Sequence, residues 1–361
     1  MLKQQKIFFD FLRFCIGSKS EIPSSLKEAD WEELYAIAKK QCLVGVLFDG
    51  IKKLPAEQVG MKMGLLFQWI AKNRMLEKAN VSLNDAAIQV SEWFRKKGFR
   101  TCILKGQGNA LMYPNPYSRT PGDIDIWVEG GDKRVISFVR SISPHEKACY
   151  HHIEFPPYKG VEVEVHYRPS FLLCFWHNRK LQKYYERVKE EQFSHRVMLG
   201  KQGEIAIPMV EFNLIFQLTH IYAHLMNEGI GLRQLLDYYY VLTSDDLSLI
   251  SDRVQEELKE LGLWKFAGGI MYIMQEVFGM PASRLIVPPN EKYGKFVLNE
   301  VLEAGNFGKH DERNRFGRSQ LGHNLQRVYR DIRLMRYFPA EALCEPVFRI
   351  WHFFWRVKNK K

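Results

Sequence analysis

The feature that most constrains the fold is a short β-rich segment inside a chain whose remaining periodicity is helical. Apolar residues recur at helical spacing through residues 1–97, and 65–97 sustain one long amphipathic pattern. From Gly98 the pattern changes to short apolar or alternating runs bounded by turn-forming residues. These candidate strands are 100–104, 123–128, 151–155 and 161–167. We therefore expect an α+β fold, with a small mixed sheet between N-terminal and C-terminal helical regions.

The change of periodicity divides the chain into three regions. We expect an N-terminal helical region at 1–97, an α/β core at 98–208 and a C-terminal helical region at 209–361. Within the core, a turn at 156–160 joins the last two runs into a hairpin. Further helices are predicted at 133–142, 209–227, 232–243, 247–261, 263–278 and 321–337, and a short strand at 204–207.

Composition excludes several classes of protein. With 46% hydrophobic and 26% charged residues, the chain is expected to fold throughout. Six cysteines without a C-x-x-C pair argue against zinc ribbons and disulfide frameworks, and favour the cytoplasm. Asp10 and Arg13 interrupt the apolar start of the chain, so no signal peptide is expected. Charges also interrupt 263–280, so we predict no membrane span.

Positive charge is concentrated near the C-terminus. The chain carries 52 Lys and Arg against 41 Asp and Glu, a net charge of +11. From Gly305 to Lys361 there are 13 basic and 5 acidic residues, a net charge of +8. Arginines recur there at 327, 330, 333 and 336. This stripe is compatible with a solvated or ion-paired face, with a surface for a triphosphate or anionic acceptor, or with nucleic-acid binding, which is not favoured because no recognised module accompanies it.

Two candidate strands carry carboxylates on one face. Because side chains alternate along a strand, Asp123 and Asp125 should point the same way. The same alternation groups Glu162, Glu164 and His166 on a later strand. Such carboxylates repel one another unless they share a proton or bind a cation, and Mg²⁺ prefers carboxylates, waters and phosphates. The pattern predicts a Mg²⁺ (or Mn²⁺) site suited to nucleotidyl transfer, with a nucleoside triphosphate (NTP) as co-substrate.

Three further residues suit phosphate binding. Gly106 lies in the turn between a strand and a short helix, where backbone N–H groups can approach a phosphate. Lys105 and Arg119 supply positive charge near the same turn. These three residues are therefore the candidate triphosphate ligands.

At these residues the sequence resembles the DNA polymerase β-like nucleotidyltransferase superfamily. The segments LKGQGNALMYPNPYSRTPGDIDIWV and EVEVHYRP look like a poorly characterised bacterial nucleotidyltransferase family with L-K-G, R-x-x-x-D-I-D and acid-x-His motifs. A weaker similarity extends through His220, His224, Arg233 and Asp237. The resemblance implies a small mixed nucleotidyltransferase sheet flanked by helices. It also implies an enzyme that transfers a nucleoside monophosphate from an NTP to a hydroxyl acceptor: a small molecule, a sugar, a protein or an RNA end.

The resemblance assigns roles residue by residue. Asp123 and Asp125 would be metal ligands and catalytic residues, Glu164 the third carboxylate, and Gly106 the phosphate-approach glycine. Glu162 competes with Glu164 on spacing alone, and the family pattern favours Glu164. The superfamily's Ser or second Gly after Gly106 is here Gln107, which keeps open an alternative: a catalytically weakened binding module for RNA or another polyanion.

The remaining polar motifs have simpler interpretations. His220 and His224 lie four residues apart on one helical face, so they are expected to be structural or to line the substrate cleft, with zinc hydrolysis a minor alternative. His151 and His152 alternate on a strand and are expected to be structural. Arg233 and Asp237, four apart, predict a helical ion pair, with a phosphate contact as the alternative for the arginine.

Overall fold

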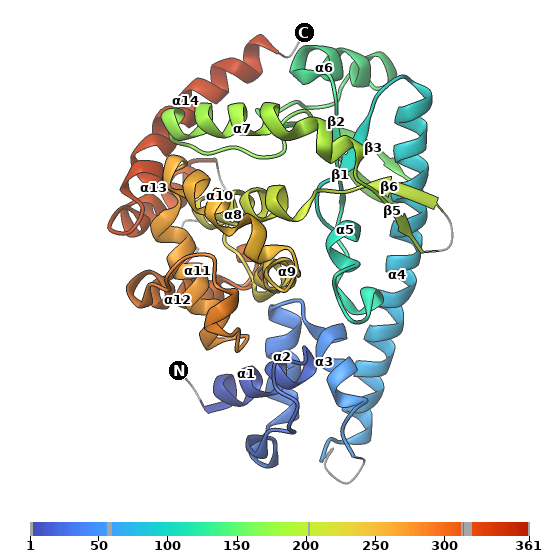
Figure 1. Ribbon diagram of the computed structural model, residues 1–361, viewed down its shortest axis with the longest axis vertical. Coiled ribbons are helices and arrows are strands. Elements are labelled where there is room, and N and C mark those ends of the chain that lie inside the picture. The colour runs from blue at the N-terminus through green and yellow to red at the C-terminus, as the bar shows by residue number, and fades with distance from the viewer. Residues whose placement is uncertain (1–2, 56–59, 201–202, 312, 314–319, 360–361) are drawn as a thin grey trace.

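The computed structural model describes residues 3–55, 60–200, 203–311, 313 and 320–359 (Figure 1). A four-stranded mixed sheet lies between helices that precede it and helices that follow it. This arrangement confirms the predicted α+β class with a small mixed sheet flanked by helices.

The helices before the sheet include one that runs along much of the molecule. They are α1 (Lys3–Cys15), α2 (Trp31–Lys40), α3 (Val44–Ile51) and α4 (Met63–Lys96). Helix α2 begins after Asp30, whose carboxylate accepts hydrogen bonds from the backbone N–H groups of Glu32 and Glu33. In Figure 1, α4 extends from the first three helices at one end of the molecule to the sheet.

The sheet places its two central strands in parallel. Its strands are β1 (Thr101–Ile103), β2 (Ile124–Val128), β3 (His152–Tyr158) and β4 (Val161–His166). The strand order is β1-β2-β4-β3, with β2 and β4 parallel and the two outer pairs antiparallel. In the β2–β4 register, Asp125 lies beside Glu164 and Trp127 beside His166. The topology thus brings the two acidic motifs together, although they are far apart in sequence.

The two faces of the sheet differ in chemistry. Ile124, Ile126 and Val128 join an apolar core with the second half of α4 and with α6 (Gly131–Ile142). The alternate residues of β2 face the other way, and Trp127 packs there against Phe193 and Phe212. The predicted alternation of β2 is therefore correct, and it directs Asp125 away from the apolar core.

Helices cover the second face and extend the chain beyond it. After the four-residue α5 (Gln107–Ala110), the later elements are α7 (Phe175–Ser194), β5 (Arg196–Leu199), β6 (Gly203–Ala206), α8 (Val210–Asn227), α9 (Leu232–Leu242), α10 (Leu247–Glu260), α11 (Trp264–Glu276), α12 (Glu291–Ala304), α13 (Gln320–Met335) and α14 (Pro339–Lys358). The predicted helices and the strand near 204–207 are present. Among the described helices, none is both long and apolar enough to cross a membrane.

Buried contacts cross the predicted region boundaries. Phe11 of α1, Trp69 of α4 and Phe216 of α8 belong to one apolar core, which joins the N-terminal helices to the C-terminal ones. The second half of α4, including Phe94, belongs instead to the core beneath the sheet. The division at 97 and 208 remains a sequence prediction, because packing links all three regions.

Candidate functional site

Three carboxylates meet at the polar face of the sheet. Asp125 lies in β2, Glu164 lies beside it in β4, and Asp123 immediately precedes β2. One carboxylate oxygen from each lies within 4.8 Å of the others. Asp125 is only 2% exposed, whereas Asp123 and Glu164 are partly accessible. Glu162, the competing candidate on spacing, is exposed and does not belong to this group.

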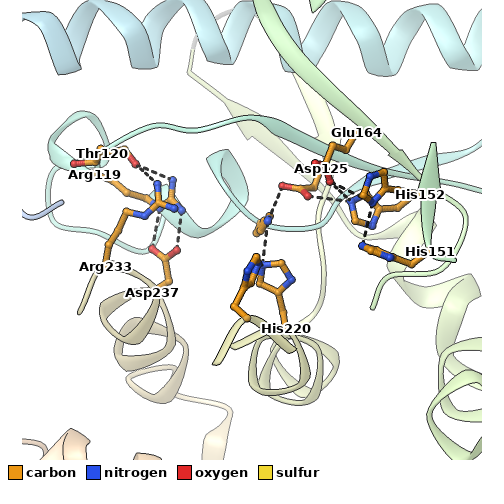
Figure 2. A network of polar contacts seen from close by, with 12 residues as sticks. Arg119, Thr120, Asp125, His151, His152, Glu164, His220, Arg233 and Asp237 are labelled. Atoms are coloured by element: carbon orange, nitrogen blue, oxygen red, sulfur yellow. Dashed lines mark hydrogen bonds and ion pairs between the residues drawn. The ribbon is translucent and has the colours of Figure 1, made fainter. Parts of the chain in front are cut away.

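A buried histidine bridges two of these carboxylates. His166 Nε2 lies 3.0 Å from Asp125 Oδ1 and 3.3 Å from Glu164 Oε2. Asp125 and Glu164 are labelled in Figure 2. Burial alone would lower the pKa of His166, but its hydrogen bonds to Asp125 and Glu164 raise that pKa to about 9. The imidazole is therefore protonated at neutral pH, and its Nε2–H donates to the carboxylates.

A lysine two residues after β1 completes the charged cluster. Lys105 Nζ lies 3.1 Å from Asp125 Oδ2 and 3.0 Å from His220 Nε2. Burial opposes its charge, but Asp125, Asp123 and Glu164 together raise the pKa of Lys105. Burial and the neighbouring ammonium lower the pKa of His220, so its neutral ring accepts a hydrogen bond from Lys105.

The carboxylates remain in electrostatic conflict despite these two cations. The charge of Asp125, followed by burial, raises the pKa of Asp123. Burial opposes the charge of Asp125, but Lys105 and His166 hold its pKa far below the usual value. Asp125 Oδ2 is buried and lies 3.1 Å from the ammonium of Lys105, whereas Asp125 Oδ1 faces His166. Three hard oxygen donors that repel one another within 4.8 Å fit a divalent cation such as Mg²⁺.

The cluster lies in the wall of a cavity of about 630 Å³, within the usual size range for small-molecule sites. Asp123, Glu164 and Lys105 line the sheet side. The cavity is also lined by basic residues from the C-terminal part of the chain, Lys309, Arg327 and Arg349. Acidic and basic groups therefore share one cavity, which suits a metal-bound anion.

The glycine turn adjoins the carboxylates, but the residue after it does not. Gly106 has φ +64° and precedes the four-residue α5, and a Cβ added there would lie 3.7 Å from the carbonyl oxygen of Asp123. Gln107 is buried, and its amide donates to Asn84 on α4. The polar group that replaces the superfamily's serine thus faces α4 and does not line the cavity.

Arg119 lies in a different cluster from the one expected. It is only 3% exposed, and its Nε and Nη2 donate to the two oxygens of Asp237 at 2.8 and 2.7 Å. Asp237 also accepts a 2.7 Å hydrogen bond from the Tyr113 hydroxyl. Asp237 therefore pairs with Arg119 in place of the expected Arg233. Arg233 Nη1 instead donates to the carbonyl of Thr120 at 3.1 Å. Figure 2 shows this cluster apart from the carboxylates, and Arg119 does not line the cavity.

Two pairs of histidines line the cavity, and for His220 and His224 this was one of the two sequence-based expectations. His220 and His224 of α8 both line it, and their Nε2 atoms lie 2.9 Å apart. Within the described ranges, no group of three or more possible metal ligands includes either, so the zinc-hydrolase alternative gains no support. His151 and His152 also line the cavity, so the expectation of two opposite faces is wrong. Strand β3 begins only at His152, and alternation does not govern the residue before it.

Comparison with known proteins gives the family. Residues 27–279 match the family model described as uncharacterised nucleotidyltransferase. No curated protein is significantly similar in sequence. The crystal structure of an antigenic nucleotidyltransferase-like protein from Paracoccidioides brasiliensis matches at 14% identity and a TM-score of 0.28, over 50% of this chain and 90% of that one. The family match spans more than half of the chain and includes every carboxylate of the cluster, so this chain belongs to that family of uncharacterised nucleotidyltransferases.

Proposed function

We propose that the protein is a Mg²⁺-dependent enzyme (Mn²⁺ being an alternative ion) that transfers a nucleoside monophosphate from an NTP to a hydroxyl acceptor. The observation that carries the proposal is the convergence of Asp123, Asp125 and Glu164 within 4.8 Å at the wall of one cavity. Membership of a nucleotidyltransferase family supports the same reaction class. Asp123, Asp125 and Glu164 would hold the cation, which when bound neutralises phosphate charge and aligns the reacting groups.

Lys105 and Gly106 are proposed to bind the triphosphate. Lys105 Nζ lies at the carboxylate cluster, 3.1 Å from Asp125 Oδ2, and Lys105 lines the cavity. A cation at the carboxylates would take over the charge neutralisation of Asp125 and release the ammonium for phosphate oxygens. Gly106 leaves the backbone next to Asp123 uncovered by a side chain. Lys309 and Arg327 supply further positive charge in the same cavity. Arg119 has no part in this proposal, because its donors are bound to Asp237.

Glu164 is proposed to accept the proton of the attacking hydroxyl. Burial opposes its charge, but the hydrogen bond from His166 lowers the pKa of Glu164, so the carboxylate is ionised at neutral pH. It lines the cavity, where an acceptor hydroxyl can approach it. His166 holds Glu164 and Asp125 in place through one shared N–H group. The acceptor hydroxyl would belong to a small molecule, a sugar, a protein or an RNA end. The six free cysteines favour a reducing cytoplasm as the location of the enzyme.

Labelled NTPs test the proposal. The full chain is incubated with Mg²⁺ or Mn²⁺, each labelled NTP and a cell extract, and mass spectrometry identifies material that has gained a nucleotide. We expect wild type to transfer the nucleotide and to release one pyrophosphate for each nucleotide transferred. We expect no detectable transfer by Asp125→Asn. Metal-dependent NTP binding without transfer, together with salt-sensitive binding of a polyanion that survives loss of both aspartates, would favour the binding-module alternative instead.

A further inference from the structure

A second group of metal-ligating side chains lies beside the carboxylates. We propose that Cys149, His151 and His152 form a site for a thiolate-binding cation of the zinc class, separate from the oxygen-rich site. This proposal stands independently of nucleotidyl transfer. One ligand atom from each of the three residues lies within 4.8 Å of the others.

The distances match the edges of a tetrahedral site. Cys149 Sγ lies 3.6 Å from His151 Nδ1 and 3.4 Å from His152 Nδ1. Zinc bonds of about 2.3 Å to sulfur and about 2.0–2.1 Å to nitrogen, set at a tetrahedral angle, place the two ligand atoms about 3.5 Å apart. His152 Nδ1 now shares a 3.0 Å hydrogen bond with His151 Nε2, and a metal bound at Nδ1 would take the place of that hydrogen bond.

The backbone already holds the three ligands in place. Cys149 N–H donates to the carbonyl of His152 at 2.9 Å, which closes a tight turn over residues 149–152. The carbonyl of His151 accepts hydrogen bonds from the N–H groups of Tyr167 and Arg168, at 3.0 and 3.1 Å. These hydrogen bonds fix the turn to the residues just after β4. Metal binding would therefore cost little backbone conformational entropy.

The ligand types select a different ion from that of the carboxylate cluster. Thiolate and imidazole favour zinc-like ions, whereas carboxylates, carbonyls and water favour Mg²⁺ or Mn²⁺. Three protein ligands leave a fourth position for water or substrate, and all three residues line the cavity. His152 Nδ1 lies only 3.5 Å from Glu164 Oε2, so the two sites adjoin within one cavity.

Cobalt titration of the full chain tests this site. Co²⁺ is used as the probe because a bound thiolate gives a ligand-to-metal charge-transfer absorption. We expect one such Co²⁺ per chain in wild type, with loss of the band and at least a tenfold weaker affinity in Cys149→Ser. His151→Ala should weaken binding similarly. The matched control Cys344→Ser should keep the band, since Cys344 lies in α14 outside the group.

A double variant separates this proposal from the proposed function. Asp123→Asn/Asp125→Asn should retain the thiolate band although it loses the oxygen-rich site, and zinc should displace the cobalt. Absence of a thiolate band in wild type, or its persistence in Cys149→Ser, would overturn the proposal. Thermal unfolding without metal shows whether each variant folds, and His151→Ala decides the outcome if Cys149→Ser does not.

Discussion

Two buried ionic clusters lie at the two ends of residues 119–125. One is suited to stabilise the fold and the other to bind a ligand. In one, Asp237 accepts hydrogen bonds from Nε and Nη2 of Arg119 and from the Tyr113 hydroxyl. None of these three residues lines the cavity beside the carboxylates. In the other, Asp125 shares its surroundings with two more carboxylates at a cavity wall. A satisfied ion pair holds elements together, whereas surplus carboxylates at a cavity are suited to bind something else.

The pKa shifts express the same contrast. Burial opposes the charge of Asp237, but Arg119 keeps the pKa of that carboxyl below its usual value. The pKa of Asp123 is raised, chiefly because Asp125 repels a second negative charge. The first cluster therefore stabilises the fold, and the second places repulsive charge where a cation can relieve it.

Asp125→Asn should give the largest effect. The substitution removes a charged ligand from the centre of the cluster while keeping its shape, so nucleotide transfer should fall on the order of 10³-fold. Labelled-NTP turnover measures the loss. Circular dichroism should show that the variant remains folded. Turnover above a tenth of wild type would place the catalytic cation elsewhere.

Asp237→Ala should act on stability instead. Removing one partner of a buried pair leaves Arg119 uncompensated, so the free energy of unfolding should fall by about 3–5 kcal/mol. Urea denaturation measures the change. The matched control is Arg119→Met/Asp237→Leu, which removes both charges and should recover part of the loss. A single-variant cost below about 1 kcal/mol would contradict a structural role for this cluster.

His166 should make stability depend on pH. Its pKa is about 9 in the folded protein and about 6.5 when unfolded, so the folded state binds more protons between these values. Stability from this group is complete below pH 6.5 and is lost as pH rises to 9, at up to about 1.4 kcal/mol per pH unit. Subtracting the His166→Gln profile isolates this contribution. A wild-type-minus-variant difference that rises with pH would reverse the assignment.

Gly106→Ala should have a smaller effect. At φ +64° a Cβ is disfavoured, so we expect a loss of about 1–2 kcal/mol in unfolding free energy. The control is Gly64→Ala in α4, where the backbone is helical and nothing lies within 4 Å of an added Cβ. Thermal or urea unfolding compares the two. Equal stability in both variants would remove the conformational requirement for glycine at 106.

Glu162→Gln should have the smallest effect. Its side chain is exposed, so stability should change by less than about 0.5 kcal/mol and turnover should stay near wild type. Glu164→Gln is the contrasting variant, because it should lose most of the transfer activity. If Glu162→Gln lost activity and Glu164→Gln kept it, the third carboxylate would have been assigned to the wrong residue.

Local patterns predicted the strands and which side chains of each strand share a face. The alternation Asp-Ile-Asp-Ile indicated which side chains of β2 share a face, and Glu-Val-Glu-Val-His did the same for β4. Spacing could not show that β2 and β4 are parallel neighbours. That pairing, which places Asp125 beside Glu164, depends on long-range contacts and not on either segment alone.

The sequence predicted the charged residues better than their partners. Arg119 and Arg233 were both visible as cations, but Arg119 binds Asp237 because α9 packs near residues 113–120, a tertiary contact that helical spacing does not report. His166 shared a face with Glu164, so its place near the carboxylates was foreseeable, whereas its contact with Asp125 across the sheet was not. The family pattern already favoured Glu164 over Glu162, and the structure agrees, because Glu164 belongs to the carboxylate group whereas Glu162 is exposed and lies outside it.

Calorimetric titration of Mg²⁺–NTP measures the cation and nucleotide site without knowledge of the acceptor. Wild type should bind the complex with measurable heat, and chelation of the metal should abolish this binding. Asp123→Ala/Asp125→Ala should bind at least tenfold more weakly, whereas the exposed-site variant Glu162→Gln should bind like wild type. Equal affinity for Mg²⁺–NTP in wild type and in the double aspartate variant would contradict the assignment of the cation and nucleotide to this cluster.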